Sequence, residues 1–172
     1  MKYQDCIDAS QVGAAAADGA ARLVEANINP ATGLASDYLN HFNEAIMLLE
    51  MLSSCPDCRG DFLSWQPRSY REHFQASRFK GRLLAIEAYN AADPRLRQNL
   101  DTLADAMTAV LEAARLAMQG EIPQHAAVAV AEDAAATLRP LIALAGAVIN
   151  GVAATGAPAS PQAVVDGLMK RA

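Results

Sequence analysis

The sequence predicts an all-α protein, and three observations support this prediction. Good helix formers (Ala, Leu, Met, Glu and Arg) dominate the 172 residues. No segment shows the sustained alternation of apolar and polar residues that indicates a half-buried strand. Several segments instead carry apolar residues at spacings of three and four, which is typical of a helix with one buried face. We therefore expect an antiparallel helical bundle of four long helices with one or two short accessory helices.

The first two predicted helices span residues 11–26 and 35–53. Ser10 is the expected N-cap of the first, whose apolar side is mostly alanine. The second carries apolar residues on more than one side, because Met47, Leu48 and Met51 lie off its main face. We expect it to contact more than one neighbour. Its main face consists of Tyr38, Phe42, Ala45, Leu49 and Leu52, widened by Leu39 and Ile46.

A third helix is predicted over residues 69–92, after a short turn at residues 61–65. It begins with a capping box, in which Ser69 and Glu72 each accept a hydrogen bond from the other residue's backbone N–H. Its apolar face changes sides near Gly81, so we expect a kink or a change of partner there.

The last two long helices are predicted at about residues 93–119 and 123–152. Asp93 and Pro94 form a typical helix start, and Gly120 is placed to end the same helix. Apolar residues repeat at spacings of three and four along both segments, which indicates an antiparallel pair with buried seams. Pro140 lies inside the second pattern and is expected to kink that helix near Thr137.

The chain divides into a helical bundle domain at residues 1–154 and a tail at residues 155–172. The tail is predicted to form a linker followed by a short amphipathic helix that begins at Ser160 and Pro161. No segment resembles a secretory signal, and the apolar stretch near residues 141–152 is too short to cross a membrane. Together with an odd number of cysteines, these observations predict a cytoplasmic protein.

Charge composition argues against two classes of partner. The chain carries 14 basic and 19 acidic residues, for a formal net charge of −5. Proteins that bind nucleic acids or anionic membrane surfaces through general electrostatics are usually basic. We therefore expect neither a nucleic acid nor a membrane as partner.

Asp37, His41 and Glu44 form the first candidate site. They are spaced i, i+4 and i+7, which places them on one strip of the second predicted helix. With Glu72 and His73 from the third helix, this strip could bind a divalent transition metal. The alternative is a boundary strip of solvated carboxylates with a hydrogen-bonded histidine. The sequence does not show whether His41, His73 and His125 converge, and it lacks the paired Glu-x-x-His motif of di-iron bundles.

Cys55 and Cys58 form a Cys-x-x-Cys motif, which is typical of a redox pair or of half a zinc site. Redox pairs usually lie at the N-terminus of a helix beside a β-α-β unit, whereas this pair follows a predicted helix end. The sequence therefore leaves three alternatives open: two free loop thiols, a zinc site and a disulfide.

Basic residues cluster near the start of the third predicted helix. With Ser69 and the helix N-terminus, this cluster could bind a phosphate or a carboxylate. A solvated face paired with nearby carboxylates is the alternative. The candidate ligand-binding residues are Arg68, Arg71, Arg78 and Lys80, followed by Arg82.

Two functional hypotheses follow from these patterns. The first is a small binding protein that is most simply a homodimer, or that docks a protein partner, because its apolar faces exceed what one small bundle covers. The second is a protein that binds a metal or a small ligand, or a metalloenzyme, with its site between the second and third predicted helices. The sequence identifies no substrate and no reaction.

Overall fold

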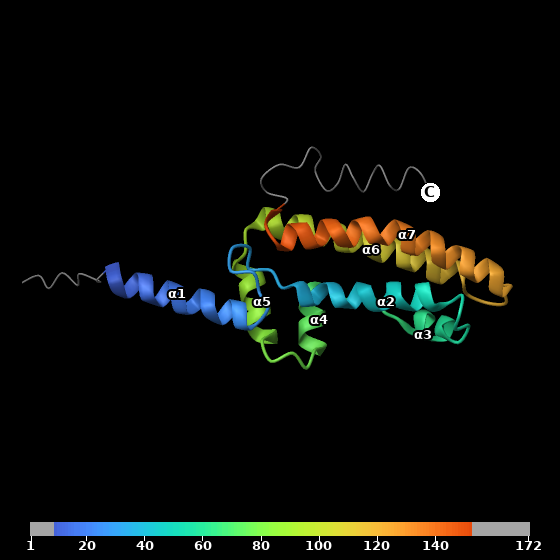
Figure 1. Ribbon diagram of the computed structural model, residues 1–172, viewed down its shortest axis with the longest axis horizontal. Helices are drawn as coiled ribbons and strands as arrows, with labels where there is room; N and C mark the ends of the chain where they lie inside the picture. The colour runs from blue at the N-terminus through green and yellow to red at the C-terminus, as the bar shows by residue number, and fades with distance from the viewer. Residues whose placement is uncertain (1–8, 153–172) are drawn as a thin grey trace, which may run out of the picture.

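The computed structural model describes residues 9–152, and it describes side chains from residue 17 onward. Every regular element in this range is helical, which confirms the all-α prediction. Figure 1 shows their arrangement. The elements are α1 (Ala9–Glu25), the 3-10 turn η1 (Ser36–Tyr38), α2 (Leu39–Met51), α3 (Cys58–Ser64), α4 (Tyr70–Ala76), α5 (Arg82–Ala91), α6 (Pro94–Ala117) and α7 (Gln124–Ile149).

The longest helices, α6 and α7, run antiparallel side by side, and α2 lies along them (Figure 1). The predicted seams are largely buried between these three helices. Leu100, Leu103 and Met107 of α6 are fully buried, as are Leu138 and Ala145 of α7. The many alanines on α7 allow this close packing because they add little side-chain volume between the helix backbones.

The prediction of four long helices is not confirmed, because the helices differ widely in length. Among the described helices only α6 and α7 exceed 20 residues, with 24 and 26 residues, whereas α2 has 13. The predicted third helix is two helices, α4 and α5, separated at residues 77–81. Ser77 adopts an extended conformation and its hydroxyl accepts a hydrogen bond from the Phe79 backbone N–H. The side-chain pattern correctly located an irregularity of the helix near Gly81, but the helix is interrupted there and is not merely kinked.

The predicted turn at residues 61–65 is wrong, because residues 58–64 form the helix α3. Cys58 and Phe62, one turn apart, are buried beside α2. Arg59 donates hydrogen bonds to the carbonyl oxygens of Met118 and Gly120, which ties α3 to the end of α6. Two buried residues are too short a pattern to distinguish a helix from a turn.

Helix α1 extends away from the other helices in Figure 1. Ser10 lies inside this helix, so it is not the N-cap that we predicted. The predicted tail at residues 155–172 lies outside the described residues. None of the described helices is both long and apolar enough to cross a membrane.

Local sequence signals at several helix ends are confirmed. Ser69 and Glu72 form the predicted capping box of α4. The Asp93 carboxylate accepts a hydrogen bond from the Arg95 backbone N–H at the start of α6. Gly120 has a φ of 77°, the left-handed conformation expected after the end of a helix.

The loop before α2 is held in place by buried hydrogen bonds. The Thr32 hydroxyl donates to the carbonyl oxygen of Ile149 over 2.7 Å. The Ala35 backbone N–H donates to the Tyr70 hydroxyl over 2.9 Å. Gly33 has a φ of 70°, and a Cβ there would lie 2.9 Å from the Ala88 carbonyl oxygen. These contacts fix where η1 and α2 begin, and so position His41.

Candidate functional site

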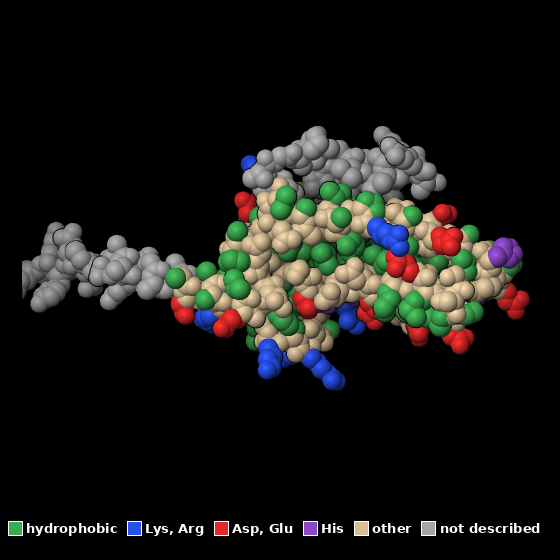
Figure 2. All heavy atoms as spheres, viewed as in Figure 1, with side chains coloured by type: hydrophobic (Ala, Val, Ile, Leu, Met, Phe, Trp, Pro, Cys, Tyr) green, Lys and Arg blue, Asp and Glu red, His purple; other side chains and the backbone are tan. Residues whose placement is uncertain are grey.

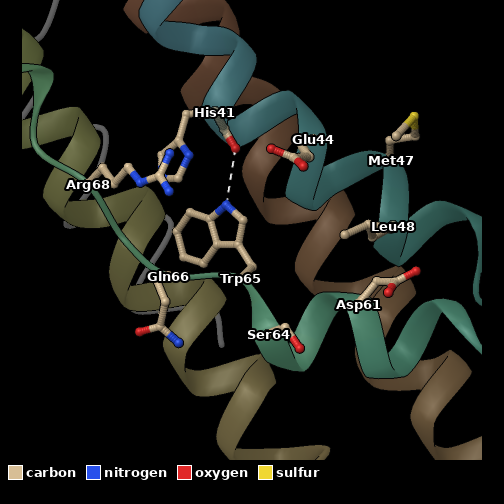
Figure 3. Close-up of a pocket in the computed structure, with 9 residues that line it drawn as sticks. All are labelled: His41, Glu44, Met47, Leu48, Asp61, Ser64, Trp65, Gln66 and Arg68. Carbon is tan, nitrogen blue, oxygen red and sulfur yellow. Dashed lines mark hydrogen bonds between the residues drawn. The ribbon is translucent and has the colours of Figure 1, made fainter. Parts of the chain in front are cut away.

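His41 and Trp65 form the centre of the candidate site (Figure 3). His41 projects from α2 and is only 5% exposed. Trp65 follows the last residue of α3, and its ring stacks on His41 with centroids 4.7 Å apart and planes 23° apart. The Trp65 indole N–H donates a hydrogen bond to the His41 carbonyl oxygen over 3.2 Å. Both rings are therefore held in defined orientations.

The His41 imidazole is neutral at physiological pH. Burial is the main reason that its pKa falls to about 4, and His73 and Arg68 lower it further. A hydrogen bond with the Gln66 backbone opposes this shift. The Nε2 atom of His41 has no hydrogen-bond partner within the described part of the protein. Because an unpaired buried nitrogen destabilises the fold, this atom requires an explanation.

His73 and Asp37 lie next to His41. His73 projects from α4, and its ring centroid is 5.9 Å from that of His41. Its Nε2 atom is 3.7 Å from Asp37 Oδ2, which is too far for a hydrogen bond. Burial lowers the pKa of His73, and the Asp37 carboxylate partly opposes this shift. The predicted residues Asp37, His41 and His73 thus come together, although they lie on three different elements.

A cavity of about 420 Å³ opens beside His41 and Trp65, between α2 and α3. In Figure 3, Arg68 lies on one side of the two rings, and Glu44 and Asp61 lie on the other. Met47 and Leu48 of α2 add apolar surface on the same side as the carboxylates. The full lining comprises His41, Glu44, Met47, Leu48, Asp61, Ser64, Trp65, Gln66 and Arg68.

The five predicted metal ligands do not form one cluster. The described residues contain no group of three or more His, Cys, Asp or Glu side chains that could hold a metal ion. Glu72 accepts hydrogen bonds from Ser69 in the capping box, so its carboxylate is already engaged. Glu44 lines the cavity, whereas His125 is exposed in the first turn of α7.

The predicted basic cluster is spread over several surfaces. Arg68 alone among these residues lines the cavity beside His41. Arg71 donates a hydrogen bond to Asn90, and Arg82 donates one to the Ser77 carbonyl oxygen. Arg78 and Lys80 are exposed. In Figure 2, basic side chains project from the connection between α4 and α5, far from the acidic side chains around α3.

Arg71 also borders a second cavity of about 290 Å³ between α4, α5 and α6. There the Tyr89 hydroxyl donates to the Asp101 carboxylate, with its oxygen 2.7 and 2.8 Å from the two carboxylate oxygens. The Arg97 guanidinium lies 5.8 Å from the centre of the Tyr89 ring. The Tyr89 hydroxyl and the Asp101 carboxylate satisfy one another, whereas the buried Nε atom of Arg97 has no hydrogen-bond partner in the described structure. We place the functional site at the larger of these two cavities, beside His41, where a neutral ring nitrogen also lacks a partner.

Trp65 and Gln66 are not among the site residues that the sequence predicts. Trp65 is the only tryptophan of the chain and follows a helix that we had predicted as a turn. A lone tryptophan between two predicted helices was the available signal. Its stacking on His41 depends on how α2 and α3 pack, which the spacing of residues does not encode.

The chain matches no known family model, no curated protein and no solved structure. Any functional conclusion must therefore come from the geometry of the site itself.

Proposed function

We propose that this protein binds a small dipolar molecule, carrying an amine and a carboxylate, in the cavity between α2 and α3. The observation that carries this proposal is the His41 imidazole. It is buried in the cavity wall, held neutral, and has an Nε2 atom with no partner in the described structure. A bound ligand would supply the missing hydrogen bond and offset the free energy lost by burying this nitrogen.

The protonation of His41 defines the ligand group that it would contact. The Gln66 backbone raises the pKa of His41 as a hydrogen-bond acceptor does, so we assign the donor nitrogen of the imidazole to the Gln66 carbonyl oxygen. A neutral imidazole has one donor nitrogen and one acceptor nitrogen. With Nδ1 as the donor, the unpartnered Nε2 is an acceptor. It is therefore suited to an N–H or O–H group of the ligand.

Charges around the cavity define the two ends of the ligand. Arg68 supplies a positive charge on one side of the His41 and Trp65 rings, and Glu44 and Asp61 supply negative charges on the other (Figure 3). Within the described structure these three side chains make no hydrogen bond or ion pair with one another. A ligand carboxylate would pair with Arg68, and a ligand ammonium with Glu44 and Asp61. Trp65 and Leu48 would contact its apolar part.

The test begins with a pool of the common α-amino acids other than tryptophan and tyrosine, whose own fluorescence would mask that of Trp65, followed by titration of each member. Trp65 is the only tryptophan, so its fluorescence reports directly on the cavity. The best ligand is then compared with its N-acetyl and amide derivatives, which lack one charge each. We expect each derivative to bind about tenfold more weakly or worse, because it loses one charge-assisted hydrogen bond.

Matched variants test which side chain binds the carboxylate of the ligand and which binds its amine. Arg68→Gln is expected to remove the preference for the free carboxylate, and Glu44→Gln to weaken the preference for the free amine. His41→Phe, which keeps a ring stacked on Trp65, is expected to abolish binding. Arg139→Gln is the control, because Arg139 pairs with Glu50 on the surface. Binding that survives His41→Phe, or a complete absence of binding by the pool, would refute the proposal.

A second candidate function rests on exposed apolar side chains of α2. Met47 and Met51 lie one helical turn apart and are 51% and 42% exposed. Two large exposed apolar residues on one face favour a contact with a second copy of the chain. Light scattering over a concentration series tests this proposal: a dimer should dissociate in Met47→Glu, whereas a wild-type monomer at all concentrations would rule the dimer out.

A further inference from the structure

Cys55 and Cys58 lie at the two ends of a tight turn that leads into α3. The Cys58 backbone N–H donates to the Cys55 carbonyl oxygen over 3.1 Å, and the Arg59 N–H donates to the Pro56 carbonyl oxygen over 3.1 Å. The same turn brings the two side chains together, because Cys55 raises the pKa of the Cys58 thiol both as a hydrogen-bond partner and as a neighbouring charge. Both cysteines are free in this structure.

The two thiols have different surroundings. Cys55 is half-buried, whereas Cys58 is buried, at 6% exposure. The hydrogen bond with Cys55, burial, and the negative charges of Asp61 and Asp57 raise the pKa of Cys58 to about 11. Arg59 follows directly in sequence, but its guanidinium binds the carbonyl oxygens of Met118 and Gly120. Cys58 is therefore a protonated thiol at neutral pH, and Cys55 is the more accessible sulfur.

We propose that Cys55 and Cys58 form a thiol–disulfide exchange site that reduces a low-molecular-weight disulfide and closes to an intramolecular disulfide. The two cysteines are adjacent across one turn and require no change in fold to meet. The accessible Cys55 is the attacking residue, and the buried Cys58 is the resolving residue. This proposal rests on neither His41 nor the amino-acid ligand.

The exchange proceeds in two balanced steps. The Cys55 thiolate attacks one sulfur of the disulfide RSSR, whose S–S bond breaks and releases one thiolate, which takes up a proton. Cys58 then loses its proton and attacks the Cys55 sulfur of the mixed disulfide, which releases the second thiol. In total, two cysteine thiols are oxidised to one disulfide and RSSR is reduced to two RSH molecules.

Closure of this disulfide would act on the wall of the cavity. Cys58 is the first residue of α3, which carries Asp61 and Ser64 and leads directly to Trp65. A covalent bond to Cys55 would fix the start of α3 relative to the end of α2. The oxidised protein would therefore hold the wall of the cavity more rigidly than the reduced protein.

The experiment uses the full chain with Cys6→Ser, which leaves Cys55 and Cys58 as the only thiols. The reduced protein is incubated with oxidised glutathione, quenched with acid, labelled with a maleimide and analysed by mass spectrometry. We expect both thiols to become unreactive, with loss of two hydrogen atoms and no retained glutathione. In Cys58→Ser, glutathione should remain attached to Cys55. In Cys55→Ser, attachment to Cys58 should be at least about tenfold slower, because that thiol is buried and protonated.

Three results would overturn the proposal. One is that both thiols stay reactive in the folded protein under conditions in which the urea-unfolded chain closes. Another is that the disulfide forms between two chains instead of within one. The third is that the purified protein carries one zinc ion per chain that protects both cysteines until a chelator is added. None of these results would affect amino-acid binding at His41, so the two proposals fail separately.

Discussion

The seam between α6 and α7 and the wall of the cavity beside His41 both contain buried side chains, but these side chains differ in chemistry. The seam contains aliphatic side chains such as Leu103, Leu111 and Leu138, which are fully buried and carry no polar atom. Beside the cavity, the buried His41 and the largely buried His73 each keep an Nε2 atom without a hydrogen-bond partner in the described structure. The first region is built for stability, whereas the second tolerates a cost in stability at the place where we infer binding.

The largest change in the free energy of unfolding is expected for a substitution in the seam between α6 and α7, and it tests the stabilising role of that seam. Leu111 is fully buried in α6, whereas Leu116 in the same helix is 71% exposed. Leu111→Ala should lower the free energy of unfolding by about 2–5 kcal/mol, because it removes buried apolar surface and leaves a cavity. Leu116→Ala should change it by less than about 0.5 kcal/mol. Urea unfolding followed by circular dichroism measures both variants, and equal losses would contradict the assignment of the seam.

The next effect concerns pH and separates the His41 region from the seam. His41 has a pKa of about 4 in the folded protein and 6.5 as its ordinary value. Between these pH values the unfolded chain binds a proton that folded His41 does not, so stability falls as pH decreases from about 6.5 to 4. The loss attributable to His41 should reach about 2–3 kcal/mol. The lowered pKa of His73 acts in the same direction.

His41→Phe isolates the contribution of His41 to this pH dependence. Wild type and variant are unfolded in urea at several pH values, so that the contribution of groups that do not interact with His41 cancels in the difference. We expect the variant to gain stability relative to wild type as pH falls. A difference that stays constant from pH 7 to 4.5 would show that His41 titrates normally and is not buried as described.

A smaller effect is expected at the start of α4, which positions His73. The capping box between Ser69 and Glu72 satisfies backbone N–H groups of the first turn. Ser69→Ala should reduce the free energy of unfolding by about 1 kcal/mol. Thermal unfolding measures this change. A Ser69→Asp variant, which retains a capping side chain, should lose much less; equal losses in the two variants would argue against a capping role.

The smallest effect is expected at the surface ion pair between Arg139 of α7 and Glu50 of α2. The two side chains are joined by a 2.7 Å contact but are 67% and 41% exposed. Exposed pairs of this kind contribute about 0–1 kcal/mol. Arg139→Ala should therefore leave the stability nearly unchanged in urea unfolding, and a loss above about 2 kcal/mol would indicate that this pair holds α2 against α7.

Much of the fold was predictable because it depends on local patterns. The spacing of apolar residues identified the buried faces of α2, α6 and α7, and single residues such as Ser69, Asp93 and Gly120 marked helix ends. The break between α4 and α5 was only partly predictable. A Cβ at Gly81 would lie 2.8 Å from both Ala26 and the Phe79 ring, and these contacts appear only after folding.

Part of the candidate site was also predictable from local sequence patterns. Asp37 and His41 share a helical strip in the sequence, but the approach of His73 depends on how α4 meets α2. For Glu72, by contrast, a local pattern was sufficient. The sequence predicted the capping box, and the carboxylate of Glu72 is engaged in that capping box. Trp65 and Gln66 join the site through the packing of α3, an element that is too short to be recognised from apolar spacing.

The most direct test of the central claim is an NMR spectrum of the histidine side-chain nitrogens, recorded with and without the pool of α-amino acids. We predict that the free protein shows His41 as a neutral imidazole with an unprotonated Nε2. Addition of ligand should shift the Nε2 resonance of His41, while the exposed His125 stays unchanged. An unchanged His41 resonance in the presence of the saturating pool would contradict the assignment of this cavity as a binding site.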